Sequence, residues 1–141
     1  MYKFCILLCF FPRFGGNSKI LKDLIYGKMN GQEAEFRAAA LWNAGWEAMY
    51  MEGPNYFFPV FANTKENHEV RIAALYWIFH AKPSNTDMSR IMSILQTEKD
   101  YEIVNFAYTL FEQFANTINP CYQETREMAR FFLKFMKQFG M

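Results

Sequence analysis

The chain has 141 residues, which suits one ordinary domain with a substantial core and is short for two. Fifteen basic residues balance fourteen acidic ones for a net charge of +1, without a basic or acidic tract, so nucleic acid is not an expected partner. Sixteen phenylalanines and nine methionines exceed what a domain of this size usually carries, which predicts that some apolar surface faces something other than the core.

The first sixteen residues, MYKFCILLCFFPRFGG, allow two interpretations. An apolar run over residues 4–11 after Lys3 is similar to a signal peptide, but a small-residue cleavage site is absent and the run is too short to cross a bilayer. The interpretation that we favour is a core helix that breaks near Pro12 and Gly15-Gly16. No other stretch is apolar enough to cross a membrane, so we expect no integral membrane span.

After this segment the apolar residues recur with a helical period, and no stretch alternates as a strand would. Short apolar helices are predicted over residues 20–26, 56–62 and 88–95, each followed by a longer one. Turn residues separate them at Gly15-Gly16-Asn17, Gly53-Pro54-Asn55, Pro83-Ser84-Asn85 and Asn119-Pro120. The predicted fold class is all-α, a HEAT-like superhelix of about three helical hairpins plus a terminal helix.

The stretch NHEVRIAALYWIFHAKPSN, residues 67–85, shows the helical pattern most clearly. Asn67 can cap the start, Glu69 lies in the first turn and Pro83 ends the helix. Because two faces of this helix are apolar, we expect an inner helix that neighbours cover on both sides. The first face holds Val70, Ala73, Ala74, Trp77, Ile78 and Ala81, and the second holds Ile72, Leu75, Tyr76 and Phe79.

A phrase within this helix occurs three times at nearly constant spacing. It begins at Glu35, Glu69 and Glu102, so the intervals are 69 − 35 = 34 and 102 − 69 = 33 residues. Such a period is typical of stacked helical hairpins, in which each unit buries its apolar faces on its neighbours. The repeated positions are Glu35, Arg37, Ala39 and Ala40, then Glu69, Arg71, Ala73 and Ala74, and in a weaker third copy Glu102, Asn105 and Ala107.

Each repeated residue type has a physical role in such a stack. Paired alanines let two helices approach closely, whereas the arginine stem packs and its head can reach an acid or a carbonyl one repeat away. The third copy has Val104 in place of the arginine and would not identify a repeat alone. The third copy and the matching turns disfavour the alternative, a chance coincidence of two similar strings.

A last helix is predicted to begin with Asn119 as its cap and Pro120 as its first residue, and to end near Gln138. Its Met and Phe stripe lies near four basic residues, Arg126, Arg130, Lys134 and Lys137, and suits contact with lipid or with a protein. The favoured alternative is packing on the preceding hairpin and on other parts of a longer protein. The stripe comprises Met128, Phe131, Phe132, Phe135, Met136 and Phe139.

Residues that carry chemistry are sparse. Cys5, Cys9 and Cys121 lack the close spacing of a zinc or redox motif, so we expect neither a disulfide framework nor a metal site. The two histidines, His68 and His80, do not form a zincin helix motif, and the sequence has no glycine-rich loop for phosphate. We therefore expect no cofactor and no enzymatic activity.

Most of the chain carries a family resemblance. The stretch FPVFANTKENHEVRIAALYWIFHAKPSNTDMSRIMSILQTEKDYEIVNFAYTLFEQFANTINP resembles the α-helical superhelix of the large lipid transfer proteins, which include the vitellogenins, apolipophorins, apolipoprotein B and the microsomal triglyceride transfer protein. The matching motifs are EVRIAA, the PS break, EKD, IVNFAYT and ANTINP. Upstream, GGNSKILKDLI is similar to the turn and following helix of that family, although Gly15-Gly16 matches imperfectly.

This resemblance implies a lipid-transport scaffold segment, from the C-terminal part of the superhelix of a vitellogenin-like or apolipophorin-like lipoprotein. In that family the superhelix wraps β-sheets that line a lipid cavity. The implied partners are therefore lipid, indirectly, and the β-sheet domains of the parent protein. Secretion and a nutrient-reservoir role are implied in the same way.

The family's β-barrel and cavity sheets have no counterpart in this sequence. We therefore expect residues 1–141 to form a single α-solenoid domain, as a fragment of a larger protein, a truncated gene product or a small paralogue, with the fragment favoured. An alternative function is a HEAT-like protein–protein interaction module with no lipid role. The length of the resemblance favours the lipid carrier.

Overall fold

The computed structural model describes residues 18–28 and 33–141. The predictions for residues 4–11 and for the Gly15-Gly16-Asn17 turn lie outside these ranges. Within the ranges the chain forms helices joined by turns, without a strand, so the all-α prediction is confirmed. No helix in this part of the chain is both long enough and apolar enough to cross a membrane.

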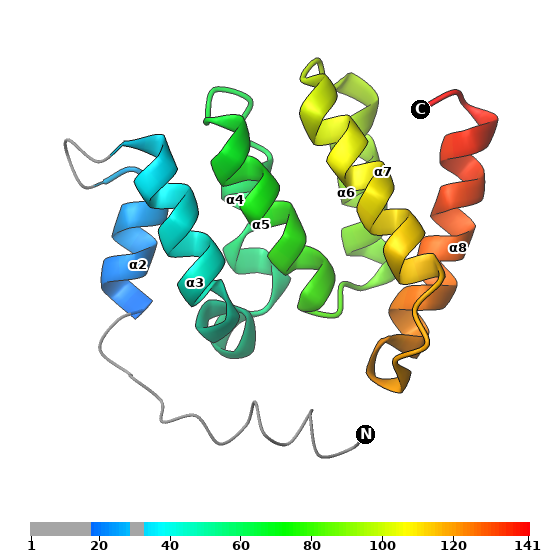
Figure 1. Cartoon of the computed structure of the whole chain (residues 1–141), viewed down its shortest axis with the longest axis horizontal. Coiled ribbons are helices and arrows are strands. Elements are labelled where there is room, and N and C mark those ends of the chain that lie inside the picture. The colour runs from blue at the N-terminus through cyan, green and yellow to red at the C-terminus, as the bar shows by residue number, and fades with distance from the viewer. Residues whose placement is uncertain (1–17, 29–32) are drawn as a thin grey trace.

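Three helical pairs and a terminal helix stack along the long axis of the molecule (Figure 1). The pairs are α2 (Ser18–Ile25) with α3 (Ala34–Glu52), α4 (Phe58–Phe61) with α5 (His68–His80), and α6 (Asn85–Thr97) with α7 (Tyr101–Ala115). Short 3-10 turns, η1 (Pro54–Tyr56) and η2 (Pro120–Tyr122), lead into α4 and into the terminal helix α8 (Gln123–Gln138). This order is the superhelix that the sequence predicts.

The helix α5 lies at the centre of the stack, packed between α3 and α7 and against α4. The side chains of Val70, Ala73, Ala74, Leu75, Ile78 and Phe79 are fully buried. Phe79 extends the core into the next pair, because its ring lies 4.9 Å from that of Phe111 and 5.3 Å from that of Phe114, measured between centroids. The prediction of an inner helix covered on both sides is therefore confirmed.

Polar side chains cap the starts of three helices. Asn67 Oδ1 accepts a hydrogen bond from Glu69 N at 2.9 Å at the start of α5, as predicted. Ser84 and Asp87 form a reciprocal capping box at the start of α6, and Asp100 Oδ1 accepts from the first turn of α7. These contacts occupy backbone N–H groups that have no partner within the helix.

The last helix starts later than predicted. Asn119 does act as a cap, accepting from Cys121 N at 3.0 Å, but the turn that it caps is η2, and α8 begins at Gln123. The tight turn arises because Tyr122 N bonds to Asn119 O and Gln123 N bonds to Pro120 O, each three residues back. The helix ends at Gln138, where the sequence places its end.

The expectation of no disulfide is wrong for Cys121, which is half-buried in η2 and disulfide-bonded. Sequence spacing misses such a bridge because the fold alone decides whether two Cα atoms come within the roughly 4.4–6.8 Å that a disulfide needs. Cys5 and Cys9 lie outside the described residues.

A glycine in α3 allows α5 to approach closely. Trp77 Nε1 donates to Leu41 O at 2.8 Å, so the indole crosses from α5 onto the α3 backbone. A Cβ atom at Gly45 would lie 2.2 Å from that same Nε1. The indole of Trp77 therefore fits only because residue 45 is a glycine and has no side chain.

Gly45→Ala should lower the free energy of unfolding by about 1–3 kcal/mol, because the added methyl group displaces the indole. This loss should appear even though alanine favours a helix over glycine by about 1 kcal/mol. Urea unfolding followed by circular dichroism measures the change. In a Trp77→Ala background the same substitution should be neutral or stabilising, and an equal loss in both backgrounds would contradict the explanation.

Candidate functional site

Arg37, in the first turn of α3, joins three segments of the chain. Its Nε donates to Leu24 O at 2.9 Å and its Nη2 to Ile25 O at 2.6 Å, at the carboxyl end of α2. Carbonyls at a helix end lack partners within the helix, so the guanidinium group completes them. The same group pairs with both carboxylate oxygens of Glu66, in the loop before α5, at 2.9 and 2.6 Å. We call this arrangement an arginine clamp.

Arg71 forms a second arginine clamp one repeat later. Its Nε donates to Phe61 O, the last residue of α4, at 2.9 Å, and its Nη2 pairs with Glu98 in the loop before α7. The side chains of Arg71 and Glu98 are 2% and 4% exposed, against 11% and 14% for Arg37 and Glu66. The second clamp is thus the more deeply buried of the two.

Both clamp acids also accept backbone hydrogen bonds at the start of the following helix. Glu66 Oε1 accepts from Asn67 N at 2.9 Å, and Glu98 Oε1 accepts from Lys99 N at 3.0 Å and Asp100 N at 2.9 Å. Burial alone would raise the pKa of each acid. The hydrogen bonds from arginine and backbone, with the arginine charge, outweigh burial and lower the pKa of both acids below the usual range. The clamps are therefore ionised at neutral pH.

The third repeat has no clamp of this kind, because Val104 occupies the arginine position. A guanidinium contact at this joint comes instead from α8, where Arg130 Nε donates to Ala115 O at 2.9 Å.

The other repeated positions differ in how far their side chains are buried. Ala73, Ala74 and Ala107 are fully buried, Ala40 is half-buried, and Glu35, Ala39, Glu69, Glu102 and Asn105 are exposed.

Arg71→Ala should lower the free energy of unfolding by about 3–5 kcal/mol, because Glu98 would stay buried without its partner. Arg37→Ala should cost less, since its clamp is more exposed. Urea unfolding at pH 7 measures both. Lys99→Ala, an exposed change beside the clamp, should stay within about 0.5 kcal/mol of the unmodified chain. Equal urea midpoints for the Arg71 and Lys99 variants would contradict the role of the clamp.

The clamp should also make stability depend on pH. A carboxylate whose pKa is lowered on folding stabilises the fold above its unfolded pKa of about 4.3, and the contribution is lost as the pH falls through the folded-state pKa. The difference in unfolding free energy between the unmodified chain and Arg71→Ala should therefore shrink below about pH 4. Urea unfolding at a series of pH values tests this. A difference that stays constant to pH 3 would contradict it.

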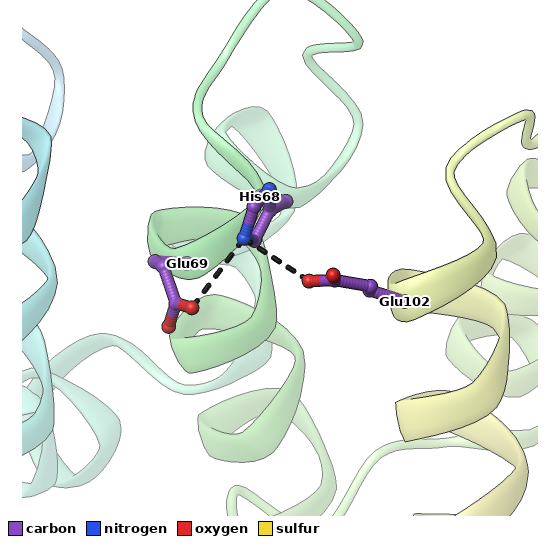
Figure 2. A group of neighbouring side chains, drawn as sticks. All are labelled: His68, Glu69 and Glu102. Atoms are coloured by element: carbon purple, nitrogen blue, oxygen red, sulfur yellow. Dashed lines mark ion pairs between the residues drawn. The ribbon is translucent and has the colours of Figure 1, made fainter.

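A histidine and two glutamates meet at the amino ends of α5 and α7. Figure 2 shows His68 between Glu69, its neighbour in α5, and Glu102 from α7. His68 Nε2 lies 3.4 Å from Glu69 Oε1 and 3.1 Å from Glu102 Oε2, and Nδ1 lies 3.8 Å from Asp100 Oδ2. One ligand atom from each of the first three residues lies within 4.8 Å of the others, so the group can hold a metal ion. We call these three residues the His68 cluster.

Sequence reasoning missed the His68 cluster. The repeat identifies Glu69 and Glu102 as equivalent positions, but sequence spacing indicates a metal site only where the ligands are close in sequence. Stacking brings equivalent positions of successive repeats together, and His68 precedes one of them directly. A histidine beside a repeated glutamate is the signal that could have found the group.

The stripe on α8 does not form one open face. Met136 is fully buried, and Met128, Phe132 and Phe135 are half-buried against the core. Phe131 and Phe139 are 65% and 61% exposed. The structure thus divides the predicted stripe between packing on the preceding helices and exposure to solvent.

The stacked pairs and arginine clamps define a helical-repeat protein. Residues 50–112, from the end of α3 into α7, match the family described as the vitellogenin TPR domain. The chain is similar to Vitellogenin-4 and Vitellogenin-3 of Caenorhabditis elegans, each 33% identical over 66 residues, or 47% of this chain and 4% of the relative. Vitellogenin-1 of the same organism is 24% identical over 79 residues, or 56% of this chain and 5% of the relative. No solved structure matches.

These similarities agree with the resemblance to the large lipid transfer proteins that the sequence motifs indicate, and the vitellogenin-like stretch contains the Arg71 clamp and the His68 cluster. The matched part of the chain spans about 4% of the length of the first two relatives. Its position in the C-terminal part of the superhelix stays a prediction.

Proposed function

We propose that the chain serves lipid transport as a scaffold segment of a vitellogenin-like or apolipophorin-like protein. The observation that carries the proposal is the match of residues 50–112 to the vitellogenin TPR domain. In the family that the sequence resembles, such helices wrap β-sheets that line a lipid cavity. The chain then supplies an outer support, and the β-sheets and the lipid are its partners within the parent protein.

The arginine clamps support a scaffold role. Apolar packing is not directional, so a stack held by packing alone has little to fix how one pair sits on the next. Each clamp adds several directed hydrogen bonds between a helix end, the next helix and a loop of the following repeat. A support that keeps its shape around a cavity needs such contacts.

A secreted location and a nutrient-reservoir role belong to the same proposal. The disulfide at Cys121 supports secretion, because disulfides form and persist in oxidising compartments.

Sequencing the transcript that encodes this chain tests the proposal. A reading frame that continues into long β-rich sequence supports the scaffold role. A product limited to helical repeats would overturn it and favour the HEAT-like interaction module without a lipid role.

The exposed part of α8 should give the chain a weak affinity for anionic lipid surfaces. Phe131 and Phe139 are exposed, and Lys134 and Lys137 between them are exposed as well, so apolar burial and charge attraction act together. In a flotation assay with phosphatidylserine-containing vesicles, the double change Phe131→Ser and Phe139→Ser should reduce the bound fraction several-fold.

Tyr101→Ser is the matched control, because it removes a ring that is 78% exposed at the start of α7. This variant should float as the unmodified chain does. An unmodified chain that fails to float would remove the lipid-surface role of α8 and leave it as a packing surface.

A further inference from the structure

We propose that the His68 cluster binds a divalent transition metal, with Zn²⁺ as the ion that suits it. A zinc–ligand bond is roughly 2.0–2.2 Å long, and the tetrahedral angle between two such bonds places the two ligand atoms about 3.4 Å apart. The distances from His68 Nε2 to Glu69 Oε1 and Glu102 Oε2, 3.4 and 3.1 Å, are close to that separation. Both glutamates are exposed, so a small rotation of either side chain closes the remaining gap (Figure 2).

The donor set favours zinc over the hard cations. Imidazole nitrogen suits zinc, copper, iron and nickel, whereas calcium and magnesium prefer oxygen ligands alone. One imidazole and two carboxylates give three protein ligands and leave a fourth position for water. Such an arrangement differs from the closed four-ligand sites of zinc fingers.

Asp100 supplies a second observation that points to a metal. Its Oδ2 lies 3.8 Å from His68 Nδ1, on the ring nitrogen opposite the proposed ligand atom. Metal-binding histidines usually donate their second N–H to a carboxylate or a carbonyl, which orients the ring. Asp100 is itself held in place, because its Oδ1 accepts from Glu102 N at 3.0 Å. At 3.8 Å the contact is an ion pair and not a hydrogen bond, so Asp100 would act as a positioning residue once a bound metal turns the ring toward it.

The local charge also favours a cation. Two helix amino ends carry a partial positive charge that opposes cation binding. Three carboxylates, from Glu69, Asp100 and Glu102, surround a single imidazole and outweigh this opposition. Within residues 18–28 and 33–141, no lysine or arginine forms an ion pair with any of them.

A metal bound here would join successive repeats. His68 and Glu69 belong to α5, whereas Glu102 belongs to α7, so one ion would tie the amino ends of two inner helices. Zinc should therefore raise the melting temperature of the chain as well as bind to it. This inference does not depend on the proposed lipid role.

Calorimetric titration of the whole chain with Zn²⁺, free of any histidine tag, tests the site. We expect one ion per chain with a Kd on the order of 10 µM. His68→Ala and Glu102→Gln should each weaken binding at least tenfold and abolish the zinc-dependent rise in melting temperature. Glu112→Gln, an exposed change further along α7, should leave both unchanged.

Asp100→Asn separates positioning from structure. Asparagine caps a helix as well as aspartate does, so the fold should persist. Loss of the carboxylate behind His68 should still weaken Zn²⁺ binding about tenfold. Co²⁺ in place of zinc should give the visible absorption of a four-coordinate ion in the unmodified chain and not in His68→Ala.

Either of two results would overturn the proposal. One is a Kd above about 1 mM for the unmodified chain, which would leave the group as a set of surface ion pairs. The other is equal zinc affinity in the unmodified chain and in folded His68→Ala, which would show that the ion binds elsewhere. Circular dichroism of each variant without metal confirms that loss of binding is not loss of fold.

Discussion

The arginine clamp is the contact on which the register of the stack depends. Arg37 and Arg71 each connect the carboxyl end of one helix, the start of the next and an acid of the following loop in one hydrogen-bonded unit, Arg37 through two carbonyls and Arg71 through one. Apolar burial supplies most of the stabilisation of such a fold, but it permits helices to slide and rotate against one another. Charged hydrogen bonds with fixed geometry select one arrangement among those that burial allows.

The parts of the fold that follow from local rules could be predicted from the sequence. Two apolar faces on residues 67–85 indicate an inner helix, Asn67 caps it, and turn residues mark the joints between pairs. The 34- and 33-residue intervals add the order of stacking, because a helical pair cannot bury both faces alone. Asn119 shows the limit of local rules, since the same cap can begin a 3-10 turn or an α-helix.

The remaining features depend on distances that the sequence does not contain. The His68 cluster exists because the amino ends of α5 and α7 come close enough for one imidazole to reach both glutamates. The disulfide of Cys121 depends on the path of the chain in the same way. On α8, helical spacing placed Met136 and Phe139 in one stripe, but the preceding helices cover Met136 and leave Phe139 open.

Because Val104 replaces the repeated arginine, the joints of the stack differ in how easily they bend. The first two joints carry buried guanidinium contacts, whereas the joint between α7 and α8 has the Arg130 bond from a side chain that is 52% exposed. A single hydrogen bond from a half-exposed side chain restrains two helices less than a clamp does, so this joint can tilt at a lower cost. In the proposed lipid scaffold, a change in the volume of the cavity would therefore bend the stack first beyond α7, while the part around α5 moves as one piece.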